Sequence, residues 1–113
     1  MTVPPDDPAI DAVGMVTFPA GTGTGLGYVA RPRGNGPFPG VLVIHENRGL
    51  LEHFRDVARR LAKIGFAALA VDLASPIGGT ARFNDLAQVT TYLGQTAAAQ
   101  HLGLLNAGVR FLQ

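Results

Sequence analysis

The sequence Gly40-Val41-Leu42-Val43-Ile44-His45-Glu46-Asn47-Arg48-Gly49-Leu50 carries the clearest structural signal in this chain. After Gly40 come four consecutive branched apolar residues without polar alternation, which predicts a β-strand buried on both faces. Four polar residues and a glycine follow directly. In open parallel α/β sheets, ligands bind in the crevice beyond the carboxyl ends of the strands. The run His45–Arg48 is therefore the best candidate for a functional site.

An amphipathic helix is predicted after this run, because apolar residues recur at three- and four-residue steps. These apolar residues are Phe54, Val57, Ala58, Leu61 and Ala62. The charged residues on the opposite side are Arg55, Asp56, Arg59, Arg60 and Lys63. We expect this basic face to be solvated, and Gly65 to follow the helix, since glycine is favoured just past a helix C-terminus.

A second buried strand is predicted over Phe66–Val71. The order strand, helix, strand implies a right-handed crossover between parallel strands. Asp72 closes the second strand, where a carboxylate could bind a metal ion or accept a phosphoryl group. We expect the more common structural role, in which the aspartate fixes the next turn by accepting hydrogen bonds from local amides.

A hairpin is predicted before the first of these strands. Residues 1–13 are expected to form a mobile arm, because closely spaced prolines lack amide donors and the acidic residues favour solvation. Met15–Phe18 and Leu26–Arg31 are the strand candidates, joined by the turn Gly21–Gly25. This glycine run lacks the G-x-G-x-x-G spacing between a strand and a helix, so a hairpin turn is favoured over a phosphate-binding loop.

Two further helices are predicted near the end of the sequence. Asn84 is a candidate N-cap for a helix that contains Leu86, Val89 and Leu93 and that breaks at Gly94. The second helix is expected over Ala97–Leu112, with Thr96 as its cap. Its predicted apolar seam consists of Leu102, Leu105, Val109 and Leu112.

Composition excludes several classes of function. The net charge is only +1 and the arginines are dispersed, so the basic stripe of a nucleic-acid-binding surface is absent from the sequence. There is no cysteine, which rules out a disulfide framework and a thiolate zinc site. No apolar run approaches the roughly 18 residues of a membrane span, and the acidic, proline-rich start is unlike a secretory signal. We expect a cytoplasmic protein without membrane association, cofactor or metal ion.

Three segments together resemble the dienelactone hydrolase family of α/β-hydrolases. They are Ile44–Leu50, the helix segment Arg55–Ala62, and the second strand with Gly65-Phe66 and Ala68–Leu73. The resemblance runs from about Tyr28 to the last residue and covers only the family's amino-terminal half. It implies an incomplete α/β-hydrolase-type sheet over residues 14–113, in which an antiparallel N-terminal hairpin precedes parallel strands with flanking helices.

The resemblance also assigns roles to two residues. In the family, a glutamate at the position of Glu46 contacts the resting nucleophile, and desolvation at the mouth of a buried strand would make this carboxylate a suitable proton acceptor for a thiol. The alternative is a glutamate that turns outward and binds loop amides. The residue after this glutamate supplies one amide of the oxyanion hole, so the resemblance implies that role for the backbone N–H of Asn47.

Other polar residues are weaker candidates. His45 precedes the glutamate on the strand, so we expect a structural histidine instead of a catalytic base. Arg48 and Arg82 could bind the carboxylate of an anionic substrate, although surface arginines are the commoner outcome. Ser75 is the only serine and lacks a G-x-S-x-G context, which argues against a nucleophile.

The sequence therefore predicts the amino-terminal portion of an ester or lactone hydrolase that acts through an acyl-enzyme intermediate. Because the nucleophile, the acid and the histidine of the triad are missing, we expect the chain to be inactive alone. The alternative is a non-catalytic interaction module, or half of a split enzyme, that pairs through an exposed strand edge with a second copy or a complementing carboxyl-terminal chain. A nucleotide- or flavin-binding domain is disfavoured, because no glycine-rich turn leads from a strand into a helix.

Overall fold

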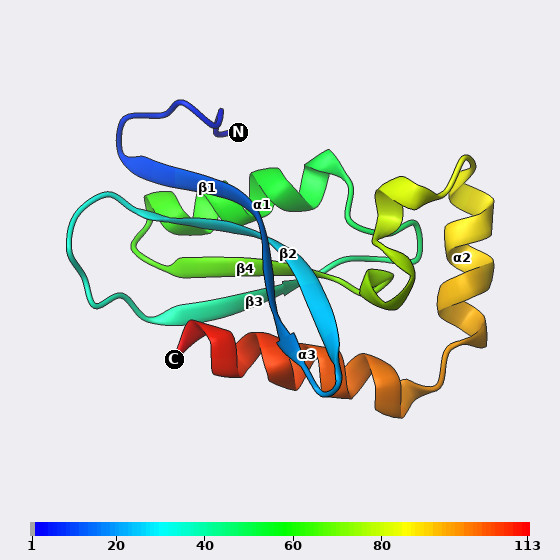
Figure 1. Cartoon of the computed structure of the whole chain (residues 1–113). Helices are drawn as coiled ribbons and strands as arrows, with labels where there is room; N and C mark the ends of the chain where they lie inside the picture. The colour runs from blue at the N-terminus through cyan, green and yellow to red at the C-terminus, as the bar shows by residue number, and fades with distance from the viewer. Residues whose placement is uncertain (1) are drawn as a thin grey trace.

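A computed structural model describes residues 2–113, and its centre is a four-stranded mixed sheet with the strand order β1-β2-β4-β3 (Figure 1). The strands are β1 (Ile10–Ala20), β2 (Gly23–Pro32), β3 (Gly40–Ile44) and β4 (Ala67–Asp72). β1 and β2 form an antiparallel hairpin, β2 is also antiparallel to β4, and β3 runs parallel to β4. The predicted hairpin and parallel crossover are thus confirmed.

Helices lie on both sides of this sheet. They are α1 (Glu52–Lys63), α2 (Leu86–Gln95) and α3 (Ala98–Leu112), and short 3-10 turns occupy Ser75–Ile77 and Thr80–Arg82. α1 packs on one face, over a core that includes Tyr28, Ala68 and Ala70. α3 packs on the other face, where Leu104 and Ala107 meet residues of β2 and β4. α2 stands apart at the end of the sheet where β3 and β4 finish (Figure 1).

β3 is an edge strand, which corrects the expectation that it is buried on both faces. Val43 is buried under α1, but Val41 and Leu42 are half-buried and Ile44 is 57% exposed. The physical reason is that β4 is the only strand paired with β3 in the described part of the chain. Within residues 2–113, no strand lies beside the other edge of β3.

The expected mobile arm differs most from the structure. β1 already begins at Ile10, and the preceding segment lies against α1; Met1 is outside the described residues. Val3 is 1% exposed, its amide donates to Asp56 Oδ1 at 2.7 Å, and its carbonyl accepts a hydrogen bond from Arg59 Nε at 2.6 Å. Lys63 Nζ donates a hydrogen bond to Asp7 Oδ2 at 2.8 Å. Side chains of α1 thus satisfy backbone groups of a segment whose prolines deny it a strand ladder.

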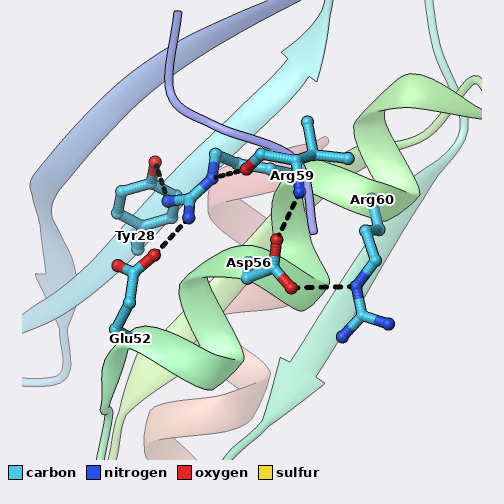
Figure 2. A network of polar contacts seen from close by, with 6 residues as sticks. Tyr28, Glu52, Asp56, Arg59 and Arg60 are labelled. Carbon is cyan, nitrogen blue, oxygen red and sulfur yellow. Dashed lines mark hydrogen bonds and ion pairs between the residues drawn. The ribbon is translucent and has the colours of Figure 1, made fainter. Parts of the chain in front are cut away.

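Arg59 is buried, which corrects its predicted place on a solvated face. Its side chain is 3% exposed and its guanidinium donates to the Tyr28 hydroxyl at 3.0 Å and to Glu52, in addition to Val3 (Figure 2). Burial lowers the pKa of the Arg59 guanidinium, but the hydrogen bonds to Tyr28 and Glu52 outweigh burial, so the net effect raises this pKa above its usual range. Asp56 is buried beside it and pairs with Arg60 Nε at 3.1 Å. Lys63 is exposed as expected.

The helix ends near the C-terminus also differ from the sequence prediction. Asp85 caps α2 by accepting a hydrogen bond from the Ala87 amide at 2.8 Å, in place of Asn84. α2 continues through Gly94 to Gln95. The hydroxyl of Thr96 donates back to the Tyr92 carbonyl at 2.8 Å, so this residue does not cap α3, whose N-cap is Ala97.

The apolar seam predicted for α3 is partly wrong. Leu102 is 59% exposed and Val109 is 41% exposed, whereas Leu104, Ala107 and Gly108 face the sheet. A Cβ atom on Gly108 would lie 2.9 Å from Val71 Cγ2. The small residues allow α3 to approach β4 closely, and this rotates part of the predicted seam away from the sheet.

Candidate functional site

The loop between β3 and α1, residues 45–51, follows the carboxyl end of β3 and forms the candidate site. It contains a turn in which the Gly49 amide donates to the Glu46 carbonyl at 3.1 Å. Gly49 has φ +90°, a conformation that residues with a side chain rarely adopt. A Cβ atom at this position would also collide with the Thr80 side chain. Glycine is therefore required here both for the backbone conformation and for the space.

His45 joins this loop to the end of β4. The residue is 5% exposed, its Nε2 accepts a hydrogen bond from the Leu73 amide at 2.9 Å, and its Nδ1 lies 2.7 Å from the Glu46 carbonyl oxygen. A backbone amide can only donate, so Nε2 has no proton and Nδ1–H is the donor to Glu46. Both ring nitrogens are engaged with backbone groups, as expected for a structural histidine.

Asp72 anchors the other side of the loop. Its carboxylate accepts hydrogen bonds from the amides of Ala74 at 2.9 Å and Thr80 at 2.7 Å, and from the Thr80 hydroxyl at 2.9 Å. Thr80 Oγ1 in turn accepts a hydrogen bond from the Leu50 amide at 2.9 Å. The prediction that Asp72 fixes the following turn is confirmed, and through Thr80 it also holds the candidate loop.

Ser75 has a structural role. Its hydroxyl accepts a hydrogen bond from the Leu26 amide at 2.9 Å and donates to the Asp72 carbonyl. The side chain is buried at the start of a 3-10 turn. It therefore lies outside the candidate loop and ties β2 to the end of β4.

The side chains at the tip of the loop have few contacts. Glu46, Asn47 and Arg48 are exposed, and none of their side chains makes a hydrogen bond or ion pair within residues 2–113. Residues 2–113 therefore do not give Glu46 the desolvated environment that the sequence predicted. The Asn47 amide likewise has no acceptor in the described part of the chain, while its carbonyl accepts a hydrogen bond from Thr90 Oγ1 at 2.8 Å.

An open cleft of about 740 Å³ lies between this loop and the start of α2. Its lining residues are Asn47, Arg48, Asn84, Asp85, Leu86, Ala87 and Thr90. The structure thus brings Asn47 and Arg48 together beside the cleft, whereas Arg82 is exposed and is not among the lining residues. Sequence reasoning missed Thr90 and Thr80, because an isolated threonine carries no signal for a contact to a distant loop.

Other kinds of site find little support in residues 2–113. Among the residues that the structure describes, no group of three or more His, Cys, Asp or Glu side chains is placed to bind a metal ion. None of the helices described has the length and apolar character that crossing a membrane requires.

Comparison with known proteins assigns the family. The sequence model of the Dienelactone hydrolase family matches residues 26–113. The chain belongs to the dienelactone hydrolase family. The same loop that follows β3 lies within the matched region, as do α1, β4 and both later helices.

Individual relatives agree with this assignment. A carboxymethylenebutenolidase-like protein from Methylorubrum extorquens is 37% identical over 99 residues, which is 87% of this chain and 34% of the relative. A protein of Escherichia coli K12 named as a hydrolase fragment, YghX, is 47% identical over 76 residues, covering 65% of this chain and 64% of that protein. A solved structure of a dienelactone hydrolase-like protein from Klebsiella pneumoniae has a TM-score of 0.80 and 32% identity, over 92% of this chain and 44% of that one.

The coverage of the longer relatives is partial. The chain spans about a third of the Methylorubrum protein and less than half of the Klebsiella protein. The roles of Glu46, Asn47, Arg48 and Arg82 stay predictions.

Proposed function

We propose that this chain is the amino-terminal portion of an ester or lactone hydrolase and that it contributes one side of the active site. The supporting observation is the loop after β3, in which the backbone is fixed by hydrogen bonds while the Asn47 amide and the Glu46 carboxylate stay without partners in residues 2–113. An oxyanion hole requires such a preorganised, free amide. Two of the relatives reported above carry the names carboxymethylenebutenolidase and dienelactone hydrolase, which favours a lactone substrate.

In this proposal, the nucleophile, the acid and the histidine of the triad come from the part of the longer relatives that this chain does not cover. A nucleophile from that part attacks the carbonyl carbon, the ring or ester C–O bond breaks to give an acyl-enzyme, and water then hydrolyses the acyl-enzyme to the acid. The Asn47 amide stabilises the oxyanion in both steps, and Glu46 accepts a hydrogen bond or proton from the resting nucleophile. Residues 1–113 are inactive alone because they contain neither a suitable nucleophile nor a catalytic base. The expected cytoplasmic location belongs to the same proposal.

The test compares the chain with a fusion. Residues 1–113 are joined to the segment of the Klebsiella protein that follows its aligned region, and both proteins are assayed with p-nitrophenyl acetate and a dienelactone. We expect the chain to match the buffer rate and the fusion to turn over. A fusion whose nucleophile is replaced by alanine serves as the control. Turnover by the unfused chain that disappears in Glu46→Ala would contradict the proposal, as would a folded fusion without activity.

A second candidate function is an interaction module that pairs through β3. Within residues 2–113, one edge of β3 has no paired strand. A cleft of about 240 Å³ at this strand is lined by Gly40, Val41, Leu42, Val109, Leu112 and Gln113. Exposed Ile44 continues this apolar surface along the strand. An open, apolar strand edge favours pairing with another chain. The proposed occupant is either a second copy or a carboxyl-terminal chain of the same family.

Sedimentation velocity over a range of protein concentrations tests whether the chain pairs through β3. The second candidate predicts a concentration-dependent dimer that Ile44→Lys disrupts, with Ile64→Lys as the control because Ile64 is exposed outside the sheet. A monomer at all concentrations that also fails to bind the carboxyl-terminal segment would refute this candidate.

A further inference from the structure

One peptide group carries the amide of the candidate oxyanion hole. The Glu46 carbonyl and the Asn47 N–H are the two ends of the peptide bond between these residues. In a planar trans peptide they point in opposite directions, so whatever fixes the carbonyl also fixes the direction of the N–H. The orientation of the proposed oxyanion donor is therefore decided by the partners of the Glu46 carbonyl.

The His45 ring is the side chain that holds this carbonyl. Its Nδ1–H donates to the Glu46 oxygen at 2.7 Å, and the Gly49 amide donates to the same oxygen at 3.1 Å. The ring is itself fixed, because its Nε2 accepts a hydrogen bond from the Leu73 amide at 2.9 Å. Phe54 packs near it, with ring centroids 6.3 Å apart. The ring is thus a rigid connection from the end of β4 to the peptide plane that contains the Asn47 N–H.

We propose that His45 is a positioning residue for the oxyanion hole. Its function is to hold the Glu46 carbonyl through its Nδ1–H, so that the Asn47 N–H is held toward the open side of the loop without direct contact between the histidine and a substrate. The Leu73 amide fixes the tautomer in which Nδ1–H is the donor. The catalytic meaning of this inference rests on the proposed function. The mechanical part, in which His45 sets the direction of the Asn47 N–H, is a property of the chain itself.

A histidine that only fills space would behave differently from such a connection. Its replacement would change stability, but not one peptide plane selectively. The two hydrogen bonds of the ring can be separated by two amide side chains. In His45→Asn, the side-chain NH₂ lies near the Nδ1 position and can still donate to Glu46, whereas the Leu73 contact is lost. In His45→Gln, the side-chain oxygen reaches the Nε2 position and keeps the Leu73 contact, but the donor to Glu46 is lost.

The experiment measures N–H residual dipolar couplings of the full chain by NMR in partially aligned medium. For the wild type we expect an imidazole ¹⁵N spectrum of the Nδ1–H tautomer and an Asn47 coupling that fits the alignment of the strands. His45→Asn should keep the Asn47 coupling within error. His45→Gln should reduce it by about half or more, while the couplings of β2 and β4 stay unchanged and show that the fold is intact.

Two results would overturn the inference. One is an unchanged Asn47 coupling in His45→Gln, which would leave the Gly49 amide as the element that orients the peptide. The other is a wild-type ring protonated at Nε2. If either variant fails to fold, the tautomer and the Asn47 coupling of the wild-type chain still decide whether the geometry exists.

The enzymatic consequence is measured separately in the fusion described above. His45→Gln should lower kcat by about 10- to 100-fold with little change in KM, since small displacements of a catalytic group have effects of this order, and His45→Asn should restore most of the rate. An inactive fusion combined with the expected couplings would reject the proposed function and leave the positioning of the peptide intact. Equal kcat values in an active fusion would reject the positioning role alone.

Discussion

Two regions of the molecule differ in how their polar side chains are used. One is the contact between the N-terminal segment and α1, and the other is the loop that follows β3. Arg59 is buried and its guanidinium binds groups from three different segments (Figure 2). Arg48, at the tip of the loop, is exposed and its side chain has no partner in residues 2–113. In the loop, hydrogen bonds from His45 and Thr90 instead hold the backbone. One region uses side chains to close the fold, and the other fixes its backbone and keeps its side chains available.

The largest effect expected from this difference is that of Arg59→Met. The substitution leaves the Val3 carbonyl and the Tyr28 hydroxyl without their donor in a buried position. Removal of one member of a buried polar network costs roughly 3 to 5 kcal/mol. Urea unfolding should therefore show a loss of about 3 kcal/mol or more. Arg48→Met is the matched control and should change stability by less than about 0.5 kcal/mol; equal effects of the two would contradict the comparison.

Gly49→Ala is expected to have the next largest effect. Alanine at φ +90° is strained by about 1 to 2 kcal/mol, and its Cβ atom would displace Thr80, which holds the Leu50 amide. Gly34→Ala is a matched control, because Gly34 has φ +114° but open space around a Cβ atom. Thermal or urea unfolding should show a clearly larger loss for Gly49→Ala. If the two variants lose the same stability, the contact with Thr80 does not constrain the loop.

The parts of the fold that the sequence predicted depend on local patterns. The hairpin and the parallel crossover follow from apolar periodicity and glycine placement, and the place of Glu46 and Asn47 follows from where the strand pattern stops. The role of Asp72 was predictable as well, because an aspartate at a strand end commonly accepts hydrogen bonds from nearby amides, here those of Ala74, two residues away, and Thr80, eight residues away. These features need no knowledge of distant segments.

The parts that failed depend on distant contacts. Arg59 lies on the polar side of its helix in sequence, but its partners Val3 and Tyr28 are 56 and 31 residues away. The apolar pattern of β3 predicted a strand inside the sheet. Within residues 2–113, however, a neighbouring strand pairs with only one edge of β3. Thr90 contacts Asn47 from 43 residues away, which no spacing rule reveals. The candidate site could therefore be located from the sequence, but the residues that hold it could not.

A smaller effect is expected from acid on the N-terminal segment. The hydrogen bond from Lys63, followed by that from the Ala9 amide, lowers the pKa of Asp7 below its usual 3.8. Because the pKa of Asp7 is lower in the folded state than in the unfolded state, ionised Asp7 stabilises the fold above pH 3.8. This contribution to stability is lost as the pH falls through the folded-state pKa. The difference in stability between the wild type and Asp7→Asn should therefore shrink below pH 3.8. A difference that stays constant down to pH 2 would contradict this account.

The smallest effect is expected at Glu46, and it is compared with Asp56 because both substitutions replace a carboxylate with an amide of the same shape. Asp56 is 6% exposed, accepts a hydrogen bond from the Val3 amide and pairs with Arg60. Asp56→Asn therefore removes a charge from a buried network and should lower the free energy of unfolding by about 1 to 3 kcal/mol. Glu46 is exposed and has no side-chain partner in residues 2–113, so Glu46→Gln should stay within about 0.5 kcal/mol. A stable Glu46→Gln chain that loses activity in the fusion would place the function of this carboxylate in chemistry. A loss of stability as large as that of Asp56→Asn would instead show that Glu46 supports the fold, and the two regions would then not differ in kind.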